Sequence, residues 1–177
     1  MVIRIYFGYN NSVIMGNMDT NEIKTISNGT GFLFAIDPEN EKIYWVTYKQ
    51  DSDDSMTSNR IPEEAMQSRE NLKKFVDSKN KSGKQYTPNI LRTNLEGKEL
   101  VNLGDLNGLM DDPVDIAIEP KTNKMYIVNW DSSTIIRANL DGTGAENLGN
   151  LNGTVDHPRG IAVLPPGVVR KSQDSNK

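Results

Sequence analysis

The sequence predicts an all-β fold of stacked four-stranded sheets, and three observations support this. Residues 90–120 recur as residues 135–165, an offset of 45 without a gap. Within each copy, short runs of alternating apolar and polar residues are separated by turn residues. A four-stranded antiparallel sheet of this size cannot bury both faces alone, but it can when stacked radially with its neighbours. The sequence therefore predicts the blades of a β-propeller.

The strands follow in order when each unit is divided into strands a to d. The third unit is complete, with strands expected at residues 114–120, 124–130, 134–141 and 145–153. The second unit has strands expected at residues 32–38, 42–48, 89–96 and 99–105. The first unit begins at strand b, with strands expected at residues 3–9, 12–19 and 22–27. A lone strand a is expected at residues 159–165, which brings the total to twelve strands, or three blades.

The repeat resembles a known family in its residues. Pro113, the run Ile116-Ala-Ile, the strand Lys124-Met-Tyr-Ile-Val-Asn-Trp and the run Thr134-Ile-Ile-Arg-Ala-Asn-Leu-Asp-Gly are similar to the YWTD repeat, the low-density-lipoprotein-receptor class B repeat. Residues 34–47 are a second copy of its first half, and residues 5–8 with 12–19 form a weaker third copy. The signature Asp is absent, since Tyr9, Thr47 and Asn129 fall near its place. The resemblance implies a six-bladed propeller that binds proteins at the cell surface or outside the cell, although the N-terminus has no signal-peptide pattern.

Three blades are half of such a ring. An open arc would leave apolar faces and strand edges in water, whereas two copies would give six blades. We therefore expect a homodimer in which the lone strand a of each chain completes the first blade of the other. Two alternatives stay open: the chain is part of a longer propeller, or another protein completes the arc. The expected divisions are residues 1–50, with the first blade and the start of the second, an insertion at 51–88, the remaining strands at 89–166, and a disordered tail at 167–177.

The insertion joins strands b and c of the second blade. Residues 61–80 are expected to form a helix, with Pro62 in the first turn and a narrow apolar stripe. In a meander, the b–c and d–a connections lie on one face of the propeller, so the insertion should border that face. It is interpreted either as a lid or partner-binding arm, or as a helix that packs on its own blade or grips the neighbouring subunit.

The same face is expected to carry a recognition patch, because loops on a rigid scaffold often carry function. Arg159 could bind a carboxylate or phosphate, and Trp130 could anchor a ligand. The competing interpretation is that the Arg and Asp side chains tie neighbouring blades together and that Trp130 fills an inter-blade gap. The candidate ligand-binding residues are Asp112, Asp115, Trp130, Asp131, His157 and Arg159.

The composition limits which functions and partners are expected. The net charge of −4, with both signs interspersed, argues against nucleic acid as a partner. There is no Cys and only one His, and no run is apolar enough to span a membrane. The sequence therefore predicts no catalytic residues, no metal ligands and no cofactor. It favours a non-catalytic scaffold, a homodimer that binds a protein or carbohydrate, over a metal-dependent hydrolase or lyase with its site at the propeller channel. A purely structural subunit is a third possibility.

Overall fold

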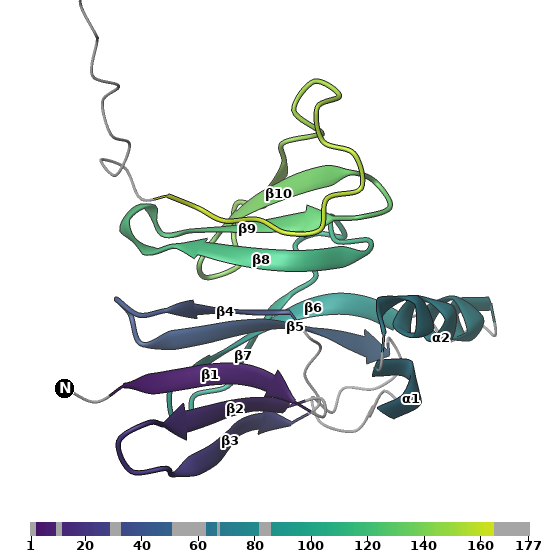
Figure 1. The fold of residues 1–177 in the computed structure, drawn as a ribbon. Coiled ribbons are helices and arrows are strands. Elements are labelled where there is room, and N and C mark those ends of the chain that lie inside the picture. Colours follow the sequence, from purple (N-terminus) through teal and green to yellow (C-terminus); the bar gives the residue numbers. More distant parts are fainter. Residues whose placement is uncertain are drawn as a thin grey trace, which may run out of the picture.

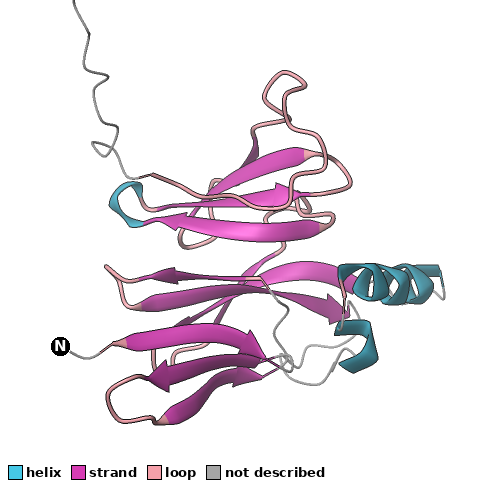
Figure 2. Ribbon diagram, viewed as in Figure 1, coloured by secondary structure: helices cyan, strands magenta, loops and turns pink. Residues whose placement is uncertain are grey.

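The computed structural model describes residues 3–9, 12–28, 33–50, 63–66, 68–81 and 86–164. These residues form three antiparallel sheets stacked face to face, as Figure 1 shows. Strands dominate the described chain, with short turns between them (Figure 2). The fold is thus mostly β and propeller-like. The expected tail at residues 167–177 lies outside the described residues.

Each sheet is a meander in chain order. The first contains β1 (Arg4–Tyr9), β2 (Ser12–Asn17) and β3 (Ile23–Asn28). The second contains β4 (Phe34–Asp37), β5 (Lys42–Gln50), β6 (Tyr86–Asn94) and β7 (Val101–Gly104). The third contains β8 (Pro113–Glu119), β9 (Lys124–Asn129), β10 (Thr134–Asn139) and β11 (Glu146–Asn147), with the short 3-10 helix η1 (Pro120–Thr122) after β8.

The connection between β5 and β6 carries two helices, α1 (Glu63–Met66) and α2 (Arg69–Lys81). The sequence predicted one helix here. The second helix starts anew at Ser68, whose hydroxyl oxygen accepts a hydrogen bond from the backbone N–H of Asn71 at 3.1 Å. This is the bond of a helix N-cap, so the serine begins α2 and separates it from α1.

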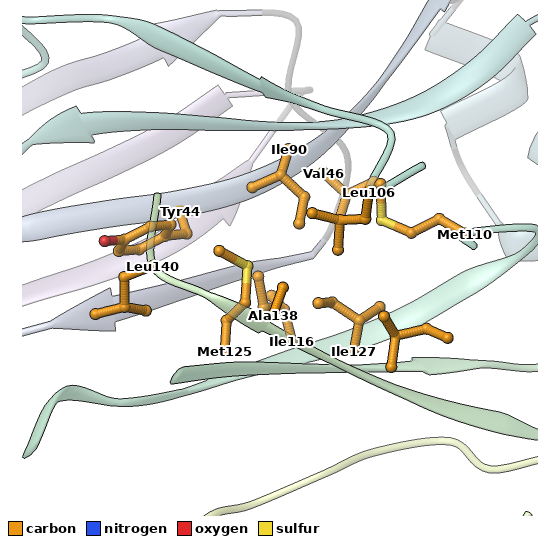
Figure 3. Close-up of a cluster of buried hydrophobic side chains, with 11 residues drawn as sticks. Tyr44, Val46, Ile90, Leu106, Met110, Ile116, Met125, Ile127, Ala138 and Leu140 are labelled. Atoms are coloured by element: carbon orange, nitrogen blue, oxygen red, sulfur yellow. The ribbon is translucent and has the colours of Figure 1, made fainter. Parts of the chain in front are cut away.

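Two apolar clusters hold the three sheets together. Between the first and second sheets, Trp45 and Ile43 of β5 pack with Val13 and Met15 of β2. Between the second and third sheets, Tyr44 of β5 packs against a cluster that Figure 3 shows in detail. That cluster consists of Tyr44, Val46, Ile90, Leu106, Met110, Ile116, Met125, Ile127, Ile136, Ala138 and Leu140. Alternate residues of β5 therefore face opposite neighbours, as a strand buried on both faces requires.

Two equivalent glycines explain part of the repeat. Gly97 and Gly142 follow the third strand of their sheets at positive φ, 76° and 85°. A Cβ on Gly97 would lie 2.3 Å from the backbone oxygen of Ile26, and one on Gly142 would lie 2.8 Å from that of Leu103. Each glycine thus lets a turn pass directly against the outer strand of the preceding sheet. The contact recurs at both internal seams because the seam itself recurs.

The C-terminal segment differs from its expected form. The sequence predicted a strand at residues 159–165, but the described residues 159–164 belong to no sheet. They run alongside the third sheet, where the backbone N–H of Ile161 donates to Asp115 Oδ2 at 2.8 Å (Figure 1). A strand requires a hydrogen-bonding neighbour. Within the described part of the chain, no strand edge adjoins this segment.

The glycine contacts give the first testable prediction. Gly142→Ala should destabilise the fold by about 3 kcal/mol, because the methyl group meets a backbone oxygen as well as an unfavourable φ. Gly108 is the matched control, since its φ is 73° but nothing lies within 4 Å of a Cβ there. Gly108→Ala should cost about 1 kcal/mol. Urea unfolding measures both, and equal losses would refute the close approach.

Candidate functional site

One end of the sheet stack gathers the connections that carry the predicted site. These are the β9–β10 turn, the loop before β8, the loop after β11 and helix α2, at the right of Figure 1. The backbone N–H of Trp130 in the turn donates to Asp112 O in the first loop at 2.9 Å. The Ser133 hydroxyl accepts from the backbone N–H of His157 in the second loop at 3.0 Å. The three connections are therefore fixed to one another, and we call this end the loop face.

Three predicted residues meet at the centre of the loop face. The guanidinium of Arg159 lies over the indole of Trp130, with Cζ 4.4 Å from the ring centroid. The imidazole of His157 meets the indole edge-on, with centroids 5.1 Å apart and planes at 64°. A cation over an indole face is attracted by the negative face of the ring. These two contacts hold the three side chains against one another. We call Trp130, His157 and Arg159 the indole cluster.

His157 is held by Asp156, its neighbour in sequence, and by Ser133 of the β9–β10 turn. Its backbone φ is 43°, in the left-handed region that L residues seldom occupy. Its Nδ1 lies 2.6 Å from Asp156 Oδ1, and its backbone N–H is bonded to Ser133. These two contacts offset the backbone cost and hold the exposed ring against the indole.

Helix α2 reaches the loop face through an ion pair. Lys73 Nζ bonds the Asp131 carboxylate of the β9–β10 turn. The hydrogen bond that Lys73 donates to the Asp131 carboxylate raises the pKa of Lys73 against the opposing effect of burial, and the charges of Asp112 and Asp77 add to the rise. At its other side the helix packs on the second sheet, where Phe75 meets Tyr86 edge-on at 5.6 Å. The helix therefore bridges two sheets beside the indole cluster.

Asp115 has a different role from the rest. Its Oδ1 accepts the backbone N–H of Ile116 at 2.9 Å, while its Oδ2 accepts that of Ile161. Both oxygens thus serve the backbone, and the carboxylate holds the C-terminal segment against the third sheet. The predicted alternative was that such aspartates tie neighbouring blades together; Asp115 instead joins the third sheet to the C-terminal segment.

The structure therefore brings most of the predicted residues together. Trp130, His157 and Arg159 form the indole cluster, and Asp112 and Asp131 lie beside it around Lys73. Sequence reasoning missed two contributors, Lys73 and Ser133. The repeat could not reveal Lys73, because the insertion has no counterpart in the other units.

A cavity lies at the opposite end of the stack, in the seam between the second and third sheets. Its volume is about 480 Å³. Arg92 and Tyr44 line it from one side, and the Arg92 guanidinium donates to Leu140 O across the seam at 3.4 Å. Burial raises the pKa of Tyr44, against the lowering effect of Arg92. No site was predicted here. Tyr44 and Arg92 of the second sheet meet Leu140 of the third at this end of the seam, and we call these polar contacts the polar seal.

The described residues hold no group of three or more His, Cys, Asp or Glu side chains suited to a metal ion. No helix among them has the length and apolar character needed to cross a membrane.

Comparisons with known proteins concern the fold. No protein-family model matches the sequence, and no curated protein sequence is similar to it. Among solved structures, the chain is similar to a chain in the crystal structure of a nidogen/laminin complex, with a TM-score of 0.58 and 10% sequence identity. The match covers 92% of this chain and 48% of that one, so this chain spans about half the length of its structural neighbour. At this identity the likeness shows the fold alone, a β-propeller-like architecture.

Proposed function

We propose that the protein is a non-catalytic recognition scaffold that binds a protein ligand on the loop face. The observation that carries this proposal is the indole cluster, a large aromatic side chain with a cation and an imidazole fixed at the edge of a rigid sheet. Trp and Arg are the residues that most often dominate binding energy at protein interfaces. The structural neighbour comes from a protein complex, which fits a binding role.

A protein ligand fits the cluster better than a carbohydrate. A sugar that stacks on an indole needs a free ring face, and Arg159 already covers one face of Trp130. The loop face carries charges of both signs, with Asp111, Asp112, Asp131 and Asp156 in its loops and Lys73 on α2. Charges of both signs can pair with complementary side chains on a protein surface.

We also propose that the active form is a homodimer whose two arcs close a six-bladed ring. The first sheet supports this, because three apolar side chains on its outer face are half-exposed: Ile3 by 49%, Ile5 by 45% and Phe7 by 39%. Such a face would be covered if another sheet stacked on it, as sheets stack inside the chain. The match to 48% of a longer propeller-like chain is what half a ring would give.

The indole cluster yields a binding prediction. Trp130→Ala should weaken ligand binding about 30-fold or more, as expected for an interface hot spot, while Trp130→Phe should retain part of it. Lys121→Ala, in η1 at the opposite end, is the control. The measurement is binding of the protein and its variants to an array of folded protein domains and to a glycan array, followed by affinities for the hits. Glycan-only binding, or domain hits that are insensitive to Trp130→Ala, would contradict the proposal.

The bridge from α2 yields a prediction about dynamics. Lys73→Ala should cost less than about 1 kcal/mol of global stability, because the pair with Asp131 is partly exposed. It should nevertheless increase amide hydrogen exchange in α2, since one of its attachments is lost. Lys74→Ala is matched, because among the described residues Lys74 pairs within the helix, with Glu70. Equal exchange in both variants would show that the ion pair does not hold the helix.

The homodimer has a direct test. Native mass spectrometry and light scattering of the full chain should give twice the chain mass of 19.8 kDa. Folded protein at the mass of a single chain, at micromolar concentration, would refute the dimer.

A further inference from the structure

We infer that residues 159–164 of one chain pair with the open edge of β1 in a second copy, in a defined register, and supply the strand that the first sheet lacks. This inference rests on the proposed homodimer and adds which edges meet and which residues oppose one another. It follows from comparing the incomplete first sheet with the two complete sheets of the same chain.

The first sheet has one open edge in the place where the others have a strand. β5 pairs with both β4 and β6, and β9 pairs with both β8 and β10. β1 is their counterpart, yet within the described residues it pairs only with β2. An apolar strand with one unpaired edge is a template for another strand. β1 is such a strand, with Ile5 and Phe7 exposed beside its open edge.

Residues 159–164 have the sequence and the position of the missing strand. They repeat residues 114–119 at the offset of 45, so Ile161 and Val163 correspond to Ile116 and Ile118 of β8. The segment is extended and runs in the direction of β8 (Figure 1), held by the Asp115 carboxylate and by Arg159 on Trp130. It is thus already placed as the first strand of a fourth sheet. The first sheet of its own chain lies at the far end of the stack, so only a second copy can offer β1.

The register follows from the third sheet. There, β8 and β9 pair Ile116 with Ile127 and Ile118 with Met125. β1 corresponds to β9 at an offset of 120, which makes Tyr6 the counterpart of Tyr126. The expected intermolecular pairs are Gly160 with Gly8, Ile161 with Phe7, Ala162 with Tyr6, Val163 with Ile5, and Leu164 with Arg4.

The sheet faces at this seam match those at the internal seams. Between the second and third sheets, Tyr44, Val46, Ile90 and Arg92 face Met125, Ile127, Ile136 and Ala138. The counterparts of the first set are Tyr126, Val128, Ile135 and Arg137, on the outer face of the third sheet. The counterparts of the second set are Ile5, Phe7, Ile14 and Gly16, on the outer face of the first sheet. An aromatic and aliphatic face would again meet an aliphatic one.

The polar seal has counterparts as well. Arg92 crosses its seam to Leu140 O. Hydrogen bonds from Thr143 lower the pKa of the adjacent Asp141 carboxyl against the effect of burial, and the charge of Arg92 adds a small further lowering. Arg137 is the counterpart of Arg92, and Asp19 is the counterpart of Asp141. In the closed ring, Arg137 of one copy would therefore face Asp19 of the other. In the single chain, Arg137 Nε donates a hydrogen bond to Glu146 Oε1 of its own sheet at 2.8 Å.

Engineered disulfides test the register, and the chain has no Cys to interfere. The variant is Ile5→Cys/Val163→Cys. Directly opposed residues of antiparallel strands have Cα atoms about 4.5–5.5 Å apart, within the range that a disulfide spans. The control is Ile5→Cys/Leu164→Cys, because a shift of one residue turns the side chain to the other face, although Leu164 is 69% exposed. Both proteins are oxidised mildly in the folded state and run on non-reducing gels, with circular dichroism of the reduced forms as a check of folding.

The first variant should form about tenfold more covalent dimer than the control. Mixing the two single variants, Ile5→Cys and Val163→Cys, should give the cross-linked pair, and each alone should not. Equal cross-linking of variant and control would overturn the register. A native dimer in which neither variant cross-links would overturn the strand pairing but leave the proposed homodimer intact, whereas a native monomer would overturn both.

Discussion

The sheets of this protein depend on neighbours, because each carries apolar side chains on both faces. The second sheet satisfies this inside the chain: Trp45 is 1% exposed against the first sheet, and Tyr44 is 1% exposed against the third. Within the described residues, each terminal sheet has one such neighbour. The half-exposed Ile5 and Phe7 lie on the face of the first sheet that no described sheet covers. The turns at Gly97 and Gly142 and the polar seal at Arg92 all depend on this stacking, because their contacts lie between neighbouring sheets.

The stacking also determines what the loop face can do. The three loops at that end are bonded to one another, because the backbone N–H groups of Trp130 and His157 donate to Asp112 O and to the Ser133 hydroxyl. Side chains fixed in this way lose little entropy when a ligand binds. The same residues also serve the fold, since Arg159 rests on Trp130 at the start of the C-terminal segment. The recognition and tying interpretations of these residues are therefore compatible.

The repeat made most of the strands predictable, whereas features that depend on a single side-chain contact or on a neighbouring strand were not. Residues 114–120 and 124–130 were expected as strands because their alternation and turns recur, and β8 and β9 fall there. The division of the insertion at Ser68 depends on one side-chain bond, which a helical pattern does not reveal. Residues 159–164 repeat residues 114–119, yet no described strand pairs with them, and the repeat alone does not reveal this. The contact of Lys73 with Asp131 joins segments 58 residues apart, and no local sequence pattern predicts it.

In the proposed dimer, assembly and recognition would share one segment, which would couple them. Arg159 belongs to the indole cluster, and Ile161 and Val163, two and four residues later, belong to the inferred intermolecular strand. Pairing that strand with β1 of a second copy would restrict the backbone that carries Arg159. Less conformational entropy would then be lost when a ligand binds the indole cluster. Thermodynamic linkage then requires the reciprocal effect, in which the ligand tightens the dimer by the same factor. A ring closed by the end of each chain thus differs from a single-chain propeller in one physical respect: its affinity for a partner depends on its own concentration.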